Sequence, residues 1–108
     1  INVVDLAKAH VIAVERMLND ISDSKIEIFN LGTGNGVSVL QLIESFERAT
    51  GVKVPFRIAP RRAGDIEKVW ANPAYANEVL GWTASTPLDQ TMLSAWKWQQ
   101  RLRERGIM

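Results

Sequence analysis

Residues 26–51 read IEIFNLGTGNGVSVLQLIESFERATG, and this stretch carries the strongest information about the fold. Its first six residues have the length and β-branched content of a strand, and alternating glycines follow them. Ser38 and Gln41 then form an S-x-x-Q capping box, and Gly51 stands where a helix ends in the left-handed conformation. The pattern therefore predicts a strand, a glycine loop and a helix over residues 39–50. The apolar residues of this helix that we expect to form its core stripe are Val39, Leu42, Ile43, Phe46 and Ala49.

The N-terminal segment predicts a short strand followed by a helix. Residues 1–4 are β-prone, and Asp5 is placed to cap a helix that begins at about Leu6. Apolar residues recur at helical spacing in two lines, which we expect to merge into one wide buried face. The two lines are Leu6, Ala9, Ala13, Met17 and Ala7, Val11, Val14, Leu18.

The C-terminal half predicts further short elements. Residues 54–58 alternate as in a half-buried strand, and 66–71 form a further extended stretch. Asn72 as N-cap and Pro73 at the first helical position begin a helix that Gly81 ends. A similar start signal opens the last helix, with Thr86, Pro87 and Asp89. The predicted fold class is α/β, as one α+β lobe over residues 1–108 with four helices and three or four short strands.

Composition excludes several classes of function. The chain has 108 residues, 46% of them hydrophobic, and 13 Lys+Arg against 12 Asp+Glu give a net charge of +1. This near-neutral balance argues against nucleic acid as a partner. Zero cysteines and one histidine leave no recognisable metal site, and no apolar run approaches the length of a membrane span. The chain starts at Ile1 without a signal segment, so we expect a cytoplasmic piece of something longer.

The glycine loop invites comparison with dinucleotide-binding loops, but its spacing differs. The dinucleotide fingerprint is G-x-G-x-x-G, whereas Gly32, Gly34 and Gly36 give G-x-G-x-G. We therefore expect turn chemistry here, with no cofactor-binding residue in this chain. No catalytic residue is predicted either, because Tyr75 lacks a lysine four residues on and His10 lacks a neighbouring nucleophile.

Residues 61–65, RRAGD, are the most promising site in the sequence. Two guanidinium groups can bind phosphate oxygens bidentately, and the carboxylate of Asp65 can accept hydrogen bonds from sugar hydroxyls. The alternative is a solvated turn in which the arginine and aspartate pair with each other. Composition alone favours the solvated turn.

Five segments at similar spacing resemble the C-terminal third of UDP-glucose 4-epimerases. They are INVVDLAKAH at 1–10, FNLGTG at 29–34, RRAGD at 61–65, LGW at 80–82 and WKWQ at 96–99. The family consists of extended short-chain dehydrogenases, in which an N-terminal Rossmann domain holds NAD and a smaller C-terminal lobe binds the nucleotide sugar. The resemblance implies that this chain is such a lobe, without the Rossmann domain.

The resemblance also implies roles for single residues. Arg62 looks like the arginine that contacts the UDP diphosphate, and Asp65 like the carboxylate that accepts from the uridine ribose. Val39 is similar in position to an apolar contact of the uracil pocket. Val69 aligns with the residue that limits room around the C2 substituent of the sugar, where some members have tyrosine. A valine there implies tolerance of N-acetylated UDP-hexosamines.

The parent enzyme implied by the resemblance interconverts UDP-glucose and UDP-galactose through transient oxidation at C4 by NAD. Its partners are a UDP-sugar substrate, its own N-terminal Rossmann domain and a second copy in a homodimer. The 108 residues alone are expected to be inactive and, with the face around Val11 and Val14 uncovered, to self-associate. Two alternatives stay open: the lobe of another NDP-sugar epimerase or dehydratase, and a stand-alone non-catalytic nucleotide-binding or scaffold module.

Overall fold

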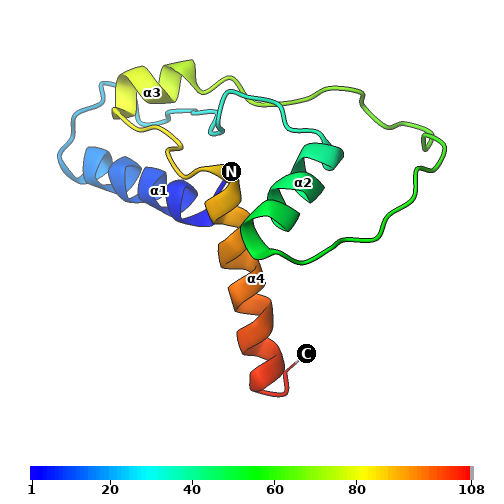
Figure 1. The fold of residues 1–108 in the computed structure, drawn as a ribbon. Coiled ribbons are helices and arrows are strands. Elements are labelled where there is room, and N and C mark those ends of the chain that lie inside the picture. Colours follow the sequence, from blue (N-terminus) through cyan, green and yellow to red (C-terminus); the bar gives the residue numbers. More distant parts are fainter. Residues whose placement is uncertain (108) are drawn as a thin grey trace. The chain divides into compact units, whose positions relative to one another are not determined.

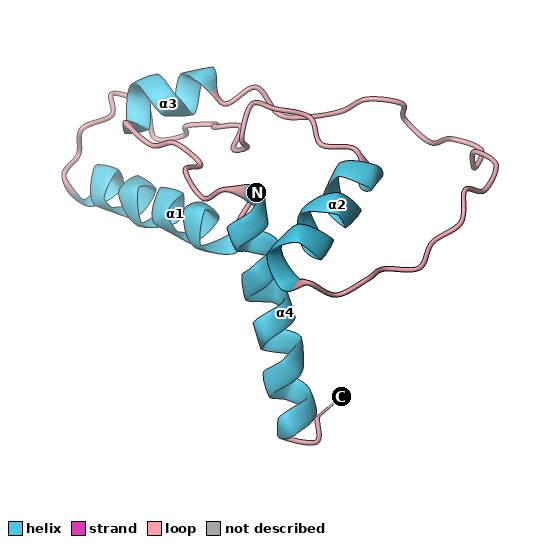
Figure 2. Ribbon diagram, in the orientation of Figure 1, coloured by secondary structure: helices cyan, strands magenta, loops and turns pink. Residues whose placement is uncertain are grey.

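The computed structural model describes residues 1–107, and within them the predicted four helices are confirmed. Figures 1 and 2 show these helices joined by long non-helical segments. Their bounds are Val3–Leu18 for α1, Val39–Thr50 for α2, Ala74–Leu80 for α3 and Leu88–Glu104 for α4. None of the helices in residues 1–107 is long and apolar enough to cross a membrane.

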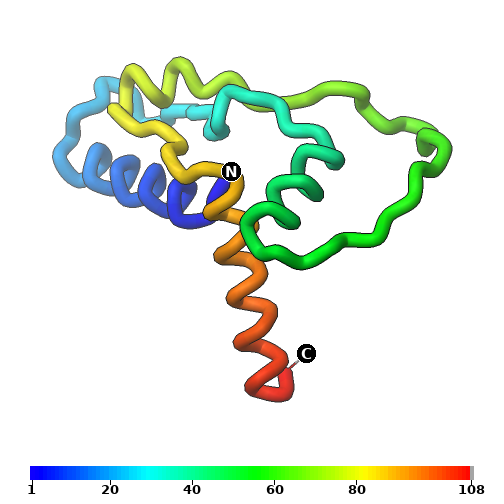
Figure 3. The backbone as a smooth tube through the Cα atoms, in the orientation of Figure 1, coloured from blue at the N-terminus to red at the C-terminus, as the bar shows by residue number. Residues whose placement is uncertain are grey.

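Contacts divide the chain into two compact units, and each is described by itself. The first unit comprises Ile1–Gly36 and Lys68–Thr86, and therefore contains α1 and α3. The second comprises Val37–Glu67 and the residues from Pro87 onward, with α2 and α4. The chain thus leaves the first unit after the glycine loop and returns to it before α3. This path can be followed along the tube in Figure 3.

A small core holds the first unit together. Ala9 of α1, Ala76 of α3 and Trp82 are buried, and the indole Nε1–H of Trp82 donates to the backbone oxygen of Asp5 at 2.8 Å. The Asp5 carboxylate in turn accepts from the backbone N–H of Thr86 at 2.9 Å. These contacts fasten the segment after α3 to the first turn of α1.

Helix α1 begins three residues earlier than the sequence predicts. Asn2 is its N-cap, because its side-chain oxygen accepts from the backbone N–H of Val4 at 2.8 Å. Asp5, predicted as the cap, lies inside the first turn and is buried against Trp82 and Thr86. The predicted strand at residues 1–4 is therefore wrong, since the Asn2 cap draws the β-branched pair that follows it into the helix.

Only one side of α1 is buried, which corrects the prediction of one wide buried face. Ala9 and Ile12 lie in or against the core. The line that continues from Val4 through Val11 and Val14 to Leu18 is exposed, with accessible fractions between 48% and 79%. Within residues 1–107, Ala76 and Trp82 cover the Ala9 side alone, so the second apolar line faces solvent.

The predicted strands at 26–31, 54–58 and 66–71 are wrong for the described part of the chain, which contains no strand. A strand exists only when its backbone pairs with a second strand, and no backbone–backbone hydrogen bond joins these segments to any other. Residues 26–31 still alternate as expected, since Ile26 and Ile28 are exposed while Phe29 packs against the core. The local pattern is present, but residues 1–107 supply no pairing partner.

In the second unit, α2 packs against α4. Phe46 and Trp96 meet edge to face, with ring centroids 5.6 Å apart and planes at 88°. The hydroxyl of Ser45, which is fully buried, donates to the carboxylate of Asp89 at 2.6 Å. The prediction placed Ser45 off the apolar stripe of this helix, so its role in the helix pair was missed.

The ends of α2 match the prediction. The Ser38 hydroxyl accepts from the Gln41 backbone N–H, the Gln41 side chain accepts from Ser38, and Gly51 has φ of +72°. The start of α4 differs, because neither Thr86 nor Asp89 supplies a side-chain cap.

Helix α3 differs from the prediction by one residue. It begins at Ala74, with Pro73 immediately before it. The side chain of Asn72 accepts from the Ala74 backbone N–H at 3.1 Å, and Gly81 ends the helix with φ of +61°. The local start and stop signals are therefore correct, and only the first helical residue moves.

Candidate functional site

Arg62 and Asp65 close the polar loop at residues 61–65. One carboxylate oxygen of Asp65 accepts from the backbone N–H and the Nε–H of Arg62, both at 3.2 Å, and the other accepts from Nη2 at 3.1 Å. Gly64 has φ of +84°, a left-handed conformation that glycine adopts without a Cβ penalty. The loop therefore holds one guanidinium and one carboxylate side by side.

This ion pair is open to solvent. The Arg62 side chain is 86% exposed and that of Asp65 is 38% exposed. An exposed pair of this kind contributes about 0–1 kcal/mol, so an anion can compete for the guanidinium at little cost. Asp65 would keep the backbone N–H of Arg62 as a donor when the guanidinium moves away. The paired turn considered as an alternative is thus what the structure shows, and it leaves the arginine available to an anion.

The two valines implied by the resemblance are both exposed. Val39 is the first residue of α2 and is 71% exposed, so its predicted place in the core stripe of that helix is wrong. It belongs to the second unit, as do Arg62 and Asp65. Val69 is 76% exposed and belongs to the first unit, one residue before Trp70. Both side chains are free of the core and open to a ligand.

The glycine loop is filled by the chain itself. A Cβ on Gly32 would lie 2.9 Å from the Cβ of Ala71, and one on Gly34 would lie 3.5 Å from the ring of Pro73. Gly36 is crowded by the indole of Trp70. The absence of a side chain at Gly32 and at Gly36 therefore admits Ala71 and Trp70, whereas Gly34 has φ of +79° and makes ordinary contact with Pro73.

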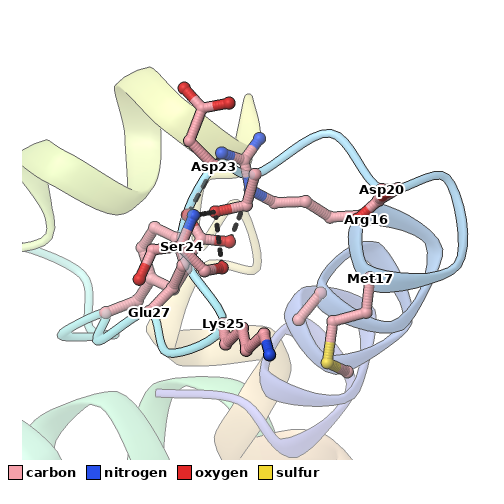
Figure 4. A pocket seen from close by; sticks show the side chains of 10 residues that line it. Arg16, Met17, Asp20, Asp23, Ser24, Lys25 and Glu27 are labelled. Atoms are coloured by element: carbon pink, nitrogen blue, oxygen red, sulfur yellow. Dashed lines mark hydrogen bonds and ion pairs between the residues drawn. The ribbon is translucent and has the colours of Figure 1, made fainter.

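A groove of about 650 Å³ lies between the end of α1 and the segment that follows it. Arg16 and Glu27 face each other there in a bidentate ion pair, at 2.8 and 3.1 Å, with each side chain 18% exposed (Figure 4). The hydrogen bond from Arg16 lowers the pKa of Glu27. Arg16 and Glu27 stand eleven residues apart, with no local sequence signal, so the sequence did not predict this pair.

A second ion pair that the sequence did not predict joins α2 to α4. The guanidinium of Arg48 donates twice to Asp89, both bonds at 2.7 Å, and the Ser45 hydroxyl adds a third bond. These donors lower the pKa of Asp89 from 3.8 to about 2, with Arg48 the larger cause. Asp89 is thereby committed to holding the two helices together and is not free to act as an acid or base.

Other chemistry-bearing side chains are dispersed. No group of three or more His, Asp or Glu side chains in residues 1–107 is arranged to hold a metal ion. The ring nitrogen Nδ1 of His10 lies 2.8 Å from the backbone oxygen of Leu6 on the exposed surface of α1. The turn at residues 61–65 places an exposed guanidinium beside a carboxylate within one short loop.

Comparison with known proteins gives a consistent set of relatives. No family model matches the chain. It is 44% identical over 101 residues to the UDP-glucose 4-epimerase of Homo sapiens and 46% identical over 99 residues to that of Bacillus subtilis. It is also 44% identical over 103 residues to a bifunctional UDP-glucose 4-epimerase and UDP-xylose 4-epimerase of Arabidopsis thaliana. These alignments cover 92–94% of this chain but only 28% of each relative.

Solved structures agree with these relatives. The chain superposes with a TM-score of 0.84 and 45% identity on a crystal structure of UDP-glucose-4-epimerase from Stenotrophomonas maltophila with bound NAD and formylated UDP-arabinopyranose. The TM-score is 0.81, at 40% identity, for the enzyme from Bifidobacterium longum in complex with NAD+ and UDP. Each match covers 94% of this chain and 29% of the other. The resemblance predicted from five short segments is confirmed, and the match is to a C-terminal part of those enzymes.

Proposed function

We propose that this chain is the nucleotide-sugar-binding part of a UDP-glucose 4-epimerase, an isomerase that interconverts UDP-glucose and UDP-galactose. The observation that carries the proposal is similarity over 94% of the chain to enzymes of that name, at 44% identity for the human enzyme. The exposed Arg62–Asp65 turn supports it, because this turn presents the two groups that a nucleoside diphosphate requires.

Arg62 binds the diphosphate in this proposal. Its planar guanidinium matches two phosphate oxygens, and a charge-assisted pair of this kind is stronger than the exposed contact with Asp65 that it replaces. The released carboxylate of Asp65 then accepts from the hydroxyls of the ribose. Val39 adds an apolar contact to the uracil. Binding energy far from the hexose holds the nucleotide while the sugar presents first one face and then the other.

NAD belongs to the parent enzyme in this proposal, held by an N-terminal Rossmann domain. The glycine loop of this chain does not match it, because its spacing is G-x-G-x-G in place of the dinucleotide fingerprint and Ala71 and Trp70 pack against Gly32 and Gly36. When bound, NAD would supply the hydride transfer at C4. The task of the present residues is to hold and orient the nucleotide, and the 108-residue chain alone is expected to show no epimerase activity.

Calorimetry of UDP binding to the chain, together with epimerase assays of the parent, tests the proposal. We expect Arg62→Ala to weaken UDP binding by about tenfold, because a bidentate charged contact is lost. Asp65→Ala should weaken it by about threefold through the ribose contact. In the parent enzyme, Arg62→Ala should raise KM for UDP-galactose to a similar extent.

Arg57→Ala is the matched control, because it removes the same charge from an exposed position in the same unit. Its effect on UDP binding should stay within about twofold. A parent that does not convert UDP-galactose would refute the epimerase assignment. A parent that is active yet indifferent to Arg62→Ala would refute only the role of the turn.

We further propose that the parent accepts N-acetylated UDP-hexosamines as well as UDP-hexoses. Val69 is small and 76% exposed, so it leaves room beside the C2 substituent. Val69→Tyr should lower kcat/KM for UDP-N-acetylglucosamine by about tenfold or more while changing that for UDP-glucose little, since added bulk in a pocket rejects the larger substrate. An intact enzyme that converts the hexoses but not the acetamido sugars would contradict this proposal.

The parent is proposed to work in the cytoplasm as a homodimer. The homodimer follows from the family resemblance. Sedimentation of the parent enzyme tests the dimer directly, and a monomer at micromolar concentration would contradict it.

A further inference from the structure

The glycine loop contains an asparagine, Asn35, that directly precedes a glycine, Gly36. A residue with a side chain, or a proline, follows each of the other five asparagines, which are Asn2, Asn19, Asn30, Asn72 and Asn77. A side chain hinders approach to the backbone nitrogen of its own residue, and proline has no N–H to lose. The amide carbon of Asn35 is therefore the one most open to the backbone nitrogen that follows it.

The backbone around Asn35 is held in a turn that leaves the Gly36 N–H free. The Thr33 hydroxyl accepts from the Asn35 N–H at 3.2 Å and donates to the Asn35 backbone oxygen at 3.1 Å. Within residues 1–107, no hydrogen bond engages the backbone nitrogen of Gly36.

The side chain of Asn35 is also weakly held. Its Nδ2 lies 3.5 Å from the backbone oxygen of Thr33, at the outer limit of a hydrogen bond. Asn35 and Gly36 are both exposed and lie outside the helices. Rotation within Asn35 is therefore enough to bring its Cγ to the Gly36 nitrogen, in full contact with water.

Trp70 explains why a glycine stands at position 36. A Cβ built there would lie 2.8 Å from Cε3 and 3.1 Å from Cζ3 of the Trp70 indole. Both atoms belong to a rigid ring, and real Cβ atoms do not approach a carbon so closely. The packing of Trp70 thus requires the same residue that leaves the neighbouring amide open to attack.

We infer that Asn35 and Gly36 form a self-modification site, at which the chain converts its own asparagine into aspartate and isoaspartate. The Gly36 nitrogen attacks Cγ of Asn35 and forms a new C–N bond. The Cγ–Nδ2 bond breaks, and Nδ2 leaves as ammonia with the proton that the Gly36 nitrogen loses. The product is a cyclic imide, a succinimide.

Water then opens the succinimide at either of its two carbonyl carbons. Addition at Cγ breaks the new C–N bond and gives aspartate with the normal backbone. Addition at the main-chain carbonyl carbon breaks the original peptide bond and gives isoaspartate, whose backbone runs through Cβ and Cγ. Overall, water enters and ammonia leaves, with no oxidation or reduction. Each product lowers the net charge of the chain from +1 to zero.

The two products differ in their effect on Trp70. Isoaspartate inserts a methylene into the backbone immediately before Gly36, and the Trp70 ring packs against that glycine. Aspartate adds the charge and leaves the backbone as it was. We therefore expect isoaspartate, and not aspartate, to disturb the contact between Gly36 and Trp70.

Incubation of the 108-residue chain in neutral buffer made with heavy-oxygen water tests the reaction. Trypsin, added after return to ordinary water, cleaves after Lys25 and Arg48, so one peptide contains both Asn30 and Asn35. Mass spectrometry should find heavy oxygen at residue 35, in aspartate and isoaspartate, while Asn30 stays an amide. Asn35→Gln is the matched variant and should stay unmodified over the same period, because its closure needs a larger ring.

The second measurement follows the indole N–H signal of Trp70 by NMR, assigned with Trp70→Phe. The isoaspartyl chain, separated by anion exchange, should show a shifted signal. Freshly prepared Asn35→Asp carries the same charge on a normal backbone, and its Trp70 signal should stay close to that of the unmodified chain. An unmoved signal in the isoaspartyl chain would reject the effect on the Trp70 contact.

Three results would overturn the modification site itself. They are no heavy oxygen at residue 35, equal incorporation at Asn30 and Asn35, and aspartate without isoaspartate, which indicates direct hydrolysis without a succinimide. The inference is independent of the proposed function, because the reaction requires neither a nucleotide sugar nor NAD. A parent without epimerase activity would therefore leave it standing.

Discussion

The two units bury different kinds of side chain. In the first unit, Ala9, Ala76 and Trp82 form an apolar core, with Asp5 buried beside them. In the second unit, as far as residues 37–67 and 87–107 are concerned, the one fully enclosed side chain is the polar Ser45. The first unit therefore has an apolar core, whereas α2 and α4 of the second unit are joined by the aromatic pair of Phe46 and Trp96 together with a hydrogen-bonded ion pair.

The stability of the two units should therefore be sensitive to different kinds of change. Packing depends on volume, so the first unit should respond most to a loss of side-chain atoms. The contact between Asp89, Arg48 and Ser45 depends on charge and hydrogen bonding, so the second unit should respond to protonation and to the loss of a single hydroxyl. Four changes of decreasing expected size test this distinction.

Trp82→Ala should have the largest effect. It removes a large buried side chain and the hydrogen bond to Asp5, and should lower the free energy of unfolding by about 4 kcal/mol. Amide exchange in α1 and α3 should accelerate far more than exchange in α2 and α4. Trp98→Ala, at a residue that is 56% exposed, is the control and should change stability by less than about 0.5 kcal/mol. Equal acceleration in all four helices would remove the distinction between the units.

Acid should loosen the second unit through Asp89. Because Arg48 and Ser45 hold its pKa near 2, below the ordinary 3.8, the folded state favours the charged carboxylate. The resulting stabilisation is complete above pH 3.8 and is lost as the pH falls toward about 2. The indole signal of Trp96 should report this transition, and Asp89→Asn should abolish it. Persistence of the transition in Asp89→Asn would assign it to another group.

Ser45→Ala should destabilise the second unit by about 2 kcal/mol, the usual value for a hydrogen bond to a charged group. The hydroxyl is fully buried and has the Asp89 carboxylate as its acceptor. Urea unfolding followed at Trp96 measures the effect. Ser94→Ala, on the exposed surface of α4, should change stability by less than about 0.5 kcal/mol. A loss no larger than that of the control would mean that packing also dominates in this unit.

Removing helix caps should have the smallest effect and should act alike in both units. Ser38→Ala and Asn2→Ala each delete a side-chain acceptor at a helix start, which costs about 1 kcal/mol. Thermal unfolding of the two variants gives the comparison. A difference larger than either loss would show that one of the two side chains has a role beyond capping.

The features that the sequence predicts correctly are local ones, such as the ends of a single helix. The bounds of α2 follow from Ser38, Gln41 and Gly51, which act on their own helix and nowhere else. The prediction that Asp89 helps to start α4 is wrong, because a carboxylate near a helix start can also bind a distant arginine. Here that arginine is Arg48, 41 residues away. The prediction of Asp5 as an N-cap is wrong for a similar reason, because its carboxylate accepts from the distant backbone N–H of Thr86.

In the candidate site, too, the local contacts follow from the sequence and the long-range contacts do not. Gly64 indicated a tight turn, and the pairing of Arg62 with Asp65 follows from three-residue spacing. That Trp70 fills the space beside Gly36 has no sequence signature, because 34 residues separate the two. The substrate roles of Arg62, Asp65, Val39 and Val69 come from the family resemblance, and they stay predictions.

The extended segment at residues 26–31 presents an unpaired backbone edge in the 108-residue chain. Its backbone groups make no backbone–backbone hydrogen bond with other segments of residues 1–107, and Ile26 and Ile28 are 78% and 80% exposed. A short β-prone run with a single charge is a template for cross-β addition of other chains. The 108-residue chain by itself should therefore associate through this segment, and Ile28→Lys should raise its soluble yield.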